Sequence, residues 1–564
     1  MDHPAQELYL LRLSGMESLP AGDVFSWKNR MYCDVEVPQF DLRPDIPFEN
    51  QPRLCQTGNN RLITEALFPA VCYFEEPVMR SCLRLWSLVL CCLWLWSAVP
   101  VVAEEPTHIG ARRELFVDDW MIHSLDNARQ ELHHPQPQEI AITYDGPAEG
   151  NTSYYVRILK DGDKYRMYYR GSHYDWEQRK RGHAEVVCYA ESDDAIHWTK
   201  PDLGLFEFNG SKQNNIVWSG IGAHNFSPFL DTNPACKADE KFKALGRGKG
   251  GLYAFASADG IHWQLMHDKP VITKGAFDSQ NLAFWDEHRG RYVDFHRAFS
   301  NKVRAIMTCT SEDFLKWTPP TLIDIKDSPP QHLYTNATIA YPRAPHLFLA
   351  FPKRFVPSRK AAWHPDPKNN HPGVSDGVLM TSRDGNTWKR WDEAFLRPGQ
   401  NQERWWQRNN HIAWGITTTP SPLPGEVPEL SLYAIENYYV GPCRLRRFTL
   451  RQDGFVSINA PYTGGEMTTR LITFDKSQGD TPVELELNLA TSAAGSVQYE
   501  LLDESGTPIP GFTLKESEEF YGDELAHTAT WKGNSDLSKL AGKPVRIRFV
   551  LKDADLYSLR FRNE

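Results

Sequence analysis

The stretch Ser257-Ala258-Asp259-Gly260-Ile261-His262-Trp263 decides the fold, because the chain repeats its pattern. Serine, aspartate two positions later and tryptophan six positions later recur at 192–198, 311–317 and 382–388, and a degenerate copy without the tryptophan spans 451–455. The copies begin 54 to 71 residues apart. A period of this size fits one four-stranded sheet per repeat, which predicts the blades of a β-propeller.

Strand-like runs precede the four full copies. Apolar or alternating stretches lie at 185–190, 251–256, 303–308 and 378–381, and each has another strand candidate before it. Long amphipathic helical patterns are scarce. Within a copy, Asp and Gly predict a tight turn between two strands, and Trp is expected to pack between blades. We therefore interpret these aspartates as structural.

Five copies predict five blades over residues 104–463, with the ring closed by the early strand around 115–117. After Gly464-Gly465 the repeat stops, and short strands separated by Gly, Pro and Asp turns fill residues 464–564. The predicted fold class is thus all-β, a five-bladed β-propeller followed by a C-terminal β-sandwich. We expect the innermost strands of the blades near 151–158, 225–231, 279–286, 333–340 and 408–415.

Residues 79–103 have the pattern of a secretory signal peptide. A basic start after Met79 leads into an apolar run over 85–96 and small residues before Glu104. The apolar run is too short for a transmembrane span. We expect residues 1–78 to be a mis-annotated or disordered extension, the alternative being a real domain followed by an internal anchor helix. The mature protein is expected to be secreted or periplasmic, without a stable membrane span.

Composition narrows the function. The 564-residue chain has a formal net charge of −10 and a pI of about 6.0, which argues against a nucleic-acid-binding surface. Aromatic residues make up 12% of it, and exposed aromatic rings suit flat ligands such as sugars. The cysteines after the signal segment show no Cys/His metal spacing. We expect no cofactor and assign no metal ligands, although a structural Ca²⁺ cannot be read from sequence.

The turns at 257–263 and 382–388 resemble blade turns of the glycoside hydrolases that include invertases, levanases and arabinanases (families 32, 43 and relatives). The stretch Glu114–Trp120 and the Gly-Ile-His-Trp element at 260–263 also resemble an uncharacterised secreted bacterial family. The resemblance implies a five-bladed propeller with acidic residues near the starts of the innermost strands. The invertase signatures Asn-Asp-Pro-Asn-Gly, Arg-Asp-Pro and Glu-Cys are missing from the sequence. No residue is therefore carried over as a known nucleophile or acid.

Glycoside hydrolysis needs two carboxyl groups beside the scissile bond. Asp278 is the first candidate, because it lies in a polar cluster directly before a predicted inner strand. Glu149 lies in a Gly-Pro-Ala-Glu-Gly stretch, and Glu436 interrupts an apolar strand. The alternatives are a turn or capping role for Asp278 and a solvent-facing position for Glu436.

Polar and aromatic residues near the predicted inner strands are candidates for substrate binding. Each of these strands opens with groups that can bind sugar hydroxyls. Basic residues nearby can hold sulfate or carboxylate, which suggests an anionic polysaccharide, with ordinary salt bridging as the alternative. The predicted substrate-binding residues are Asn151, His224, Asn225, Gln280, Asn281, His296, Arg297, Asn336, Arg354, Asp376, Trp406, Arg408 and Asn410.

The sequence therefore predicts a secreted glycoside hydrolase that cleaves an oligo- or polysaccharide with paired carboxylates in the propeller funnel. Two alternatives stay open. One is a non-catalytic carbohydrate-binding propeller, and the other is a polysaccharide lyase that uses Tyr or His as its base and Arg to neutralise a uronate. The expected partner is carbohydrate, with no nucleic acid.

Overall fold

β-strands account for most of the regular structure, so the all-β prediction is confirmed. The computed structural model describes residues 104–361, 372–423, 425–477, 479 and 481–562, which all belong to one compact unit. The predicted signal segment and the extension before it lie outside the described residues. No helix within these ranges is long and apolar enough to cross a bilayer. The helical turns described are the short 3-10 segments Ala238–Glu240, Gln402–Arg404 and Ser538–Leu540.

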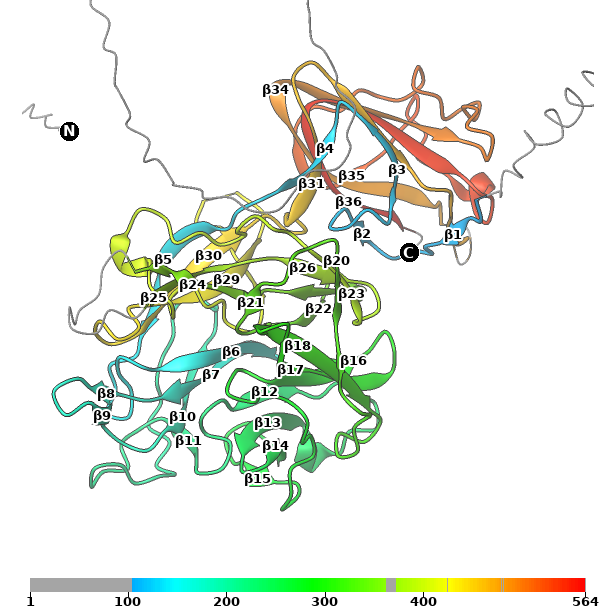
Figure 1. Ribbon diagram of the computed structural model, residues 1–564. Coiled ribbons are helices and arrows are strands. Elements are labelled where there is room, and N and C mark those ends of the chain that lie inside the picture. The colour runs from blue at the N-terminus through cyan, green and yellow to red at the C-terminus, as the bar shows by residue number, and fades with distance from the viewer. Residues whose placement is uncertain (1–103, 362–371, 424, 478, 480, 563–564) are drawn as a thin grey trace, which may run out of the picture. The chain divides into compact units, whose positions relative to one another are not determined.

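Three four-stranded antiparallel sheets follow one another along the chain (Figure 1). The first contains β6 (Tyr154–Asp161), β7 (Lys164–Gly171), β10 (Val186–Ser192) and β11 (Ile216–Ser219), with the hairpin β8 (Tyr174–Asp175) and β9 (Lys180–Arg181) between β7 and β10. The second contains β12 (Ser227–Leu230), β13 (Phe242–Gly248), β14 (Gly251–Ser257) and β15 (Gln264–Leu265). The third contains β16 (Leu282–Asp286), β17 (Arg291–Ser300), β18 (Val303–Ser311) and β19 (Thr321–Leu322).

Two further sheets continue this order. The fourth contains β22 (Ile339–Tyr341), β23 (Ala344–Ala350), β26 (Met380–Ser382) and β27 (Thr387–Arg390), and β20 (Asp324–Lys326) pairs with β27 in parallel. It is extended by a three-stranded sheet of β21 (His332–Leu333), β24 (Lys353–Lys360) and β25 (Pro372–Gly377). The fifth contains β28 (Thr417–Thr419), β29 (Glu429–Glu436), β30 (Arg444–Leu450) and β5 (Gln136–Thr143).

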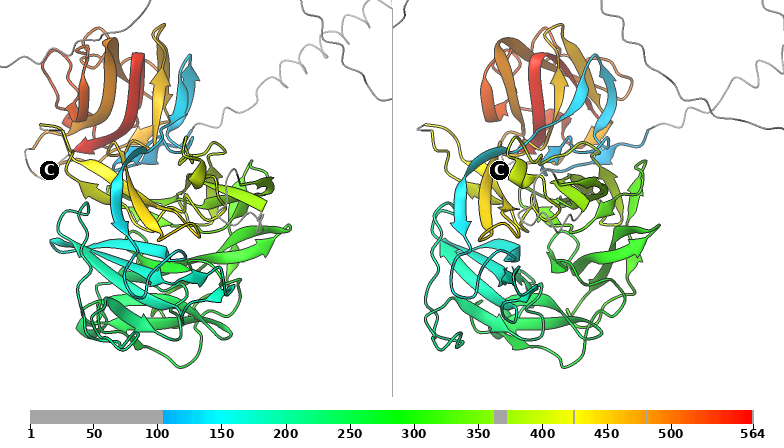
Figure 2. Two further views of the ribbon diagram at one scale, coloured as in Figure 1. Left: turned by 90° about the vertical axis from the view of Figure 1, so that its left-hand side faces the viewer. Right: turned by 60° about the vertical axis from the view of Figure 1, so that its left-hand side comes forward.

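The five sheets lie in a ring (Figure 2), and hydrogen bonds join each sheet to the next. The last of these bonds joins the fifth sheet back to the first, so the order is cyclic. Such a ring of sheets around a common centre is the arrangement of a β-propeller. In ring order, the bonds run from Arg157 Nε to Pro228 O, Asn225 Nδ2 to Ser279 O, Asn336 Nδ2 to Phe295 O, Asn410 Nδ2 to Ser375 O, and Ile158 N to Trp414 O.

The four full copies of the repeat form one kind of turn. In the second copy, Asp259 Oδ1 accepts the backbone N–H groups of Ile261 at 2.9 Å and His262 at 2.8 Å. Trp263 Nε1 donates to the carbonyl of Gly260 at 3.0 Å. These bonds confirm the structural interpretation of the repeated aspartates. The fourth residue of every full copy has a positive φ, at 60° in Ala195, 77° in Gly260, 65° in Phe314 and 81° in Gly385.

The ring is not closed by the expected strand. β5 pairs with β30 and supplies the outer strand of the fifth sheet, whereas Leu115 pairs with Ser558 in β36 (Arg546–Arg562). An apolar run such as 115–117 predicts burial but does not identify the partner strand. The segment 408–415, expected as an inner strand, lies before β28, which begins at Thr417, but it is bridged to β29 through Ile412 and to β6 through Trp414.

The C-terminal strands form one curled eight-stranded sheet. Its two long strands, β34 (Glu484–Leu502) and β36, pair along most of their length, with register breaks that let them bend. β1 (Thr107–His108) pairs separately with β33 (Ile472–Thr473). The N-terminal segment thus contributes strands to this part of the chain. The remaining strands of the curled sheet are β2 (Glu114–Leu115), β3 (Ile122–Asp126), β4 (Arg129–Leu132), β31 (Val456–Ala460), β32 (Gly465–Thr469) and β35 (Asp523–Thr528).

Aromatic side chains fill the spaces between neighbouring sheets. Trp388 of the fourth sheet is 1% exposed, and its ring centroid lies 5.7 Å from that of Phe295 in the third sheet. A separate apolar core fills the curled sheet, where Phe474 stacks on Phe561 at 3.9 Å. Packing between blades, as expected for the repeated tryptophans, is confirmed for Trp388.

Replacing Trp388 by alanine should strongly destabilise the ring. The change removes a fully enclosed side chain and leaves a cavity between two sheets, which costs about 3–5 kcal/mol in comparable cores. Urea unfolding followed by tryptophan-independent circular dichroism measures the change. The control is Tyr521→Ala, whose side chain is 73% exposed and whose loss should be nearly neutral. Equal stability of the two variants would contradict the packing role of Trp388.

Candidate active site

The predicted substrate-binding amides make their hydrogen bonds inside the protein. Asn225 donates to the backbone carbonyls of Phe277 and Ser279, and Gln280 donates to the carbonyl of Val156 at 3.1 Å. All six amide side chains are at most 6% exposed, and each bonds at least one backbone carbonyl. Their contacts therefore tie one backbone segment to another. The six are Asn151, Asn225, Gln280, Asn281, Asn336 and Asn410.

The carboxyl group of Glu149 is enclosed by hydrogen-bond donors. Its side chain is fully buried, and Lys200 Nζ lies 2.6 Å from Oε2. Tyr169 donates its hydroxyl to Oε1 at 2.5 Å, and the backbone N–H of Gly146 donates to Oε2 at 2.8 Å. The carboxylate is thus surrounded by donors from its own sheet and the adjoining loops.

Glu436 is also internal, at 1% exposure. The Nε atoms of Arg446, Arg404 and Arg444 lie 2.7, 3.2 and 3.4 Å from its carboxylate oxygens. Three guanidinium groups therefore compensate one buried carboxylate. Glu149 and Glu436 belong to separate internal ion pairs, with different partners from those of Asp278.

Asp278 is the predicted catalytic carboxylate that reaches solvent, with a side chain that is 53% exposed. Its Oδ1 lies 2.9 Å from His224 Nε2, and His224 Nδ1 lies 2.8 Å from Glu185 Oε2. The hydrogen bond from His224 lowers the pKa of Asp278 well below its usual range; burial opposes this, and the charges of Arg297 and Arg247 reinforce it. The carboxylate is therefore ionised near neutral pH.

Glu185 shares the same histidine. Burial raises the pKa of Glu185, but the hydrogen bond from His224 and the charge of Arg170 outweigh it, so the pKa is lowered. Arg170 Nη1 lies 3.5 Å from Glu185 Oε1. His224 thus bridges two ionised carboxylates from different sheets.

Tyr334 lies among four basic side chains. Arg408 Nη1 donates to its hydroxyl at 3.1 Å, and Lys353 Nζ is 4.2 Å from its ring centroid. The guanidinium carbons of Arg297 and Arg304 are each 5.4 Å from the same ring. Burial lowers the pKa of Lys353 well below its usual range, and the neighbouring arginines lower it further.

Tyr155 and His411 border this group. The Tyr155 hydroxyl lies 3.4 Å from that of Tyr334, and Tyr155 has a φ of 54°, which is rare for a bulky residue and typical of strained functional positions. The ring of His411 stacks on Tyr154 with centroids 4.5 Å apart. Within the described residues, both buried ring nitrogens of His411 lack a hydrogen-bond partner. Burial and nearby positive charges lower the pKa of His411 well below its usual range, so the ring is neutral.

Together these side chains form what we call the cationic cluster. All five sheets, with their adjoining loops, contribute to it. It holds five arginines and one lysine against two carboxylates, and Arg170, Arg297 and Lys353 are at most 7% exposed. Crowding basic groups in this way is costly unless a negative partner compensates them. The members are Arg170, Glu185, His224, Arg247, Asp278, Arg297, Arg304, Tyr334, Lys353 and Arg408.

Four of the predicted site residues meet in this cluster: His224, Asp278, Arg297 and Arg408. The sequence also placed Tyr334 at the opening of a predicted inner strand and Lys353 beside the predicted Arg354, but it did not single out Arg170, Glu185, Arg247 or Arg304. The Tyr154-Tyr155 pair at the start of a predicted inner strand was the one available signal for Tyr155. Arg170, Glu185 and Arg304 lie on or beside strands of ordinary pattern, and nothing in the sequence distinguishes them.

The remaining predicted residues lie elsewhere. Arg354 and Asp376 form a bidentate ion pair, with Nε to Oδ1 at 2.9 Å and Nη2 to Oδ2 at 2.6 Å. Trp406 is 2% exposed and His296 is fully buried. His296 therefore faces the interior of the third sheet.

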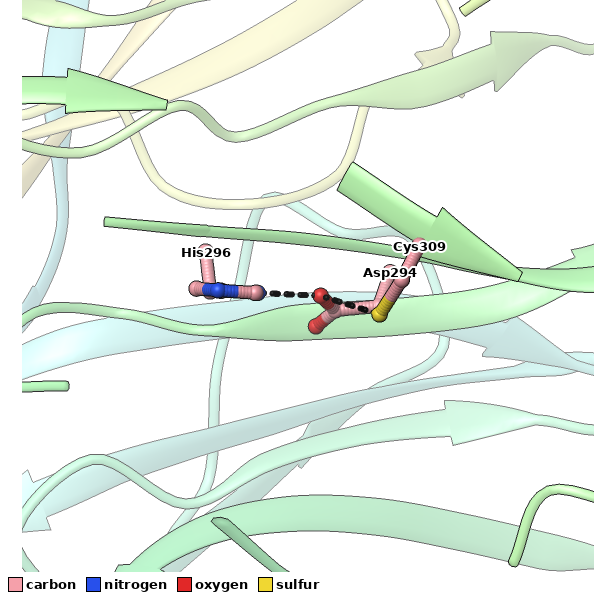
Figure 3. A group of neighbouring side chains, drawn as sticks. All are labelled: Asp294, His296 and Cys309. Carbon is pink, nitrogen blue, oxygen red and sulfur yellow. Dashed lines mark hydrogen bonds and ion pairs between the residues drawn. The ribbon is translucent and has the colours of Figure 1, made fainter. Parts of the chain in front are cut away.

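His296, Asp294 and Cys309 form a buried polar group on β17 and β18 (Figure 3). Their possible metal-ligand atoms lie within 4.8 Å of one another. His296 Nδ1 and Cys309 Sγ both hydrogen-bond to Oδ1 of Asp294, the sulfur at 3.4 Å, and His296 Nε2 bonds the Lys274 carbonyl at 3.0 Å. Because these atoms already bond one another, we assign no ion to the group.

Solved structures that are similar to the chain include proteins described as glycoside hydrolases. An N-acetylgalactosamine deacetylase from F. plautii is 13% identical, with 57% of this chain and 95% of that chain covered and a TM-score of 0.38. A family GH62 α-L-arabinofuranosidase from Coprinopsis cinerea is 10% identical, with 57% and 99% covered and a TM-score of 0.36. A GH32 β-fructofuranosidase from Bombyx mori is 11% identical, with 77% and 94% covered and a TM-score of 0.35. Structural similarity at this level does not assign the activity of any of these enzymes to this protein.

No protein-family model matches the chain. Two uncharacterised proteins of Mycobacterium tuberculosis strains are similar to part of it, at 28% identity over 141 residues and 26% over 145 residues. In each case the match covers 24% of this chain and 43% of the relative. The chain thus spans less than half the length of the curated relatives it matches.

Replacing Glu436 by glutamine should destabilise the fold. The change leaves three arginines around a neutral side chain, and breaking a buried ion pair in this way costs about 3–5 kcal/mol. Denaturant unfolding measures the loss. Glu466→Gln is the matched control, because Glu466 also pairs with an arginine, Arg548, but is 39% exposed, and its removal should cost about 1 kcal/mol or less. A loss for Glu436→Gln no larger than the control's would contradict its role as a buried counter-ion.

Proposed function

We propose that this protein cleaves glycosidic bonds in an anionic oligo- or polysaccharide, at the cationic cluster. One observation carries the proposal: basic side chains from four of the five sheets lie around Tyr334 and Asp278, and the whole cluster has two carboxylates to balance them. Arginine binds sulfate and carboxylate through paired N–H groups, and tyrosine rings suit contact with sugar rings. A sulfated or uronic-acid glycan supplies the missing negative charge.

The five sheets are proposed to be the blades of a five-bladed propeller, and the curled C-terminal sheet a sandwich-like module. In this proposal the propeller domain extends from β5 to β30. The module combines strands from 456–562 with those from the N-terminal segment 107–132. Export through the signal-like segment 79–103 remains part of the proposal, since a secreted or periplasmic enzyme would meet such glycans.

Hydrolysis is the first candidate reaction. Asp278, ionised and half exposed, is suited to activating a water molecule or attacking the anomeric carbon. The Tyr334 hydroxyl can donate the proton that the leaving oxygen needs. The partly occluded arginines hold the substrate's acidic groups. In this assignment Asp278 is the catalytic carboxylate, whereas the internal partners of Glu149 and Glu436 support structural roles for them.

Elimination is the second candidate, and the surroundings of Tyr334 favour it. Arg408 donates a hydrogen bond to its oxygen, and three further basic groups lie near its ring. In an elimination the tyrosine oxygen would take the proton α to the carboxyl group of a uronate while an arginine neutralises that carboxylate. Under this mechanism the bond to the leaving oxygen breaks without water, and the new chain end is unsaturated.

Asp278→Asn should lower turnover by about 10²–10⁴-fold under the hydrolytic mechanism, because it removes the negative charge of the reacting group. Products from a panel of uronic-acid and sulfated polymers are analysed by mass and by ultraviolet absorbance. A product that gains the mass of water supports hydrolysis, and an absorbing product without that gain supports elimination. The matched control is Asp268→Asn, which alters an 84% exposed carboxylate. Cleavage at the normal rate by Asp278→Asn would contradict its catalytic assignment.

An anionic glycan should stabilise the protein. A ligand that binds the folded state at 100 times its dissociation constant adds about 2.7 kcal/mol of stability. Thermal unfolding with and without a uronic-acid or sulfated oligosaccharide measures the shift, and a neutral oligosaccharide of equal length is the control. Arg408→Ala should abolish most of the difference between the stabilisation by the charged oligosaccharide and that by the neutral one. Equal shifts with charged and neutral sugars would contradict the anionic substrate.

A further inference from the structure

A groove next to the cationic cluster has the chemistry of a second glycan-binding surface. It has a volume of about 720 Å³, within the ~300–1,000 Å³ typical of small-molecule sites, and lies along β21, β24 and β25. Asp376 is its one acidic residue among the described lining residues, and it is already paired with Arg354. The basic and aromatic lining residues are His332, Arg354, Phe355, Arg359, Arg397 and Trp405.

Arg304 connects the groove to the cluster. Its guanidinium carbon lies 5.4 Å from the ring of Tyr334 in the cluster and 5.3 Å from the ring of Phe355 in the groove. Its Nη1 is 3.3 Å from His332 Nδ1, and its buried Nε has no hydrogen-bond partner within the described residues. One arginine thus lies between the two sites, so a bound chain can be continuous across them.

Trp405 gives the groove a fixed aromatic wall. It is partly exposed, and its Nε1 donates to the carbonyl of Gly399 at 2.8 Å, which holds the indole in place. An immobilised ring loses little freedom on stacking against a sugar. Arg359 and Arg397 add positive charge on the same surface, and Arg359 is exposed.

We propose that this groove binds the portion of an anionic polysaccharide that extends beyond the cationic cluster. The inference rests on the proposed function and deepens it: the substrate is a polymer, held at a second set of subsites, rather than a short oligosaccharide. Affinity then grows with chain length until the groove is filled. Short substrates occupy only the cationic cluster, so they do not contact Trp405 or Arg397 and their affinity does not depend on these residues.

The test measures binding in the Asp278→Asn background, where hydrolytic turnover is suppressed, and ultraviolet absorbance checks that elimination does not cleave the ligand during the titration. Isothermal titration calorimetry at fixed salt compares polygalacturonate and carrageenan with their disaccharides. We expect at least one polymer to bind about tenfold or more tightly than its disaccharide. Adding Trp405→Ala or Arg397→Ala should weaken polymer binding about 5- to 30-fold and leave disaccharide binding unchanged. Arg129→Ala, which removes an exposed arginine that pairs with Glu131, is the matched control.

The outcomes separate the two proposals. Equal affinity for polymer and disaccharide, or polymer affinity that neither groove variant changes, overturns the groove. Length-dependent binding that Trp405→Ala weakens supports it. If the unmodified protein then cleaves neither polymer, only the proposed cleavage fails. Absence of binding to every probe overturns both. Circular dichroism and unfolding midpoints of each variant, compared with the parent, establish that a lost affinity is not a lost fold.

Discussion

In the first two copies of the repeated turn, the backbone carbonyl at the fourth position joins one sheet of the ring to the next. In the second copy, Gly260 O accepts the indole N–H of Trp263 from its own turn and the hydroxyl of Tyr168 from the first sheet. In the first copy, Ala195 O accepts from Trp198 and from Tyr433 of the fifth sheet. A carbonyl oxygen has two lone pairs, so one bond shapes the turn while the other attaches the neighbouring sheet.

The turn also has a demanding backbone geometry. All four full copies have a positive φ at the fourth position, and in the second copy the aspartate accepts two N–H groups of the turn. Glycine adopts this conformation without strain, but Ala195 and Phe314 adopt it too. The bonds and tertiary packing of the ring therefore compensate a local preference of about a kilocalorie per mole or more.

A rigid ring is what makes the cationic cluster possible. Arg170, Arg297, Arg304, Lys353 and Arg408 would repel one another in a flexible chain, and each comes from a strand or loop fixed by its own sheet. The scaffold thus holds like charges together in advance, and a negative ligand would bind to a site that needs little rearrangement. The buried amides serve the same end, because each ties backbone segments near the site to one another. At the curled sheet, the buried carboxylate of Asp453 makes a separate set of contacts, accepting bonds from Tyr341, Arg343 and Ser558.

The repeat by itself determined the all-β class, the succession of sheets and the structural role of the aspartates, because all of these follow from local turn chemistry and strand periodicity. The sequence also allowed Asp278 and His224 to be predicted as site residues, since both precede predicted inner strands. Only the tertiary structure decided which acids meet solvent. The local sequence around Glu149 and Glu436 is compatible with a catalytic role. In the structure, however, Lys200 pairs with Glu149, and three arginines surround Glu436. The tertiary structure also decided that the six amide side chains bond to backbone carbonyls and that β5 closes the ring. It placed Arg170, Glu185 and Arg304 in the cationic cluster. Exposure and charge balance depend on contacts between residues far apart in the chain, and no local pattern records those contacts.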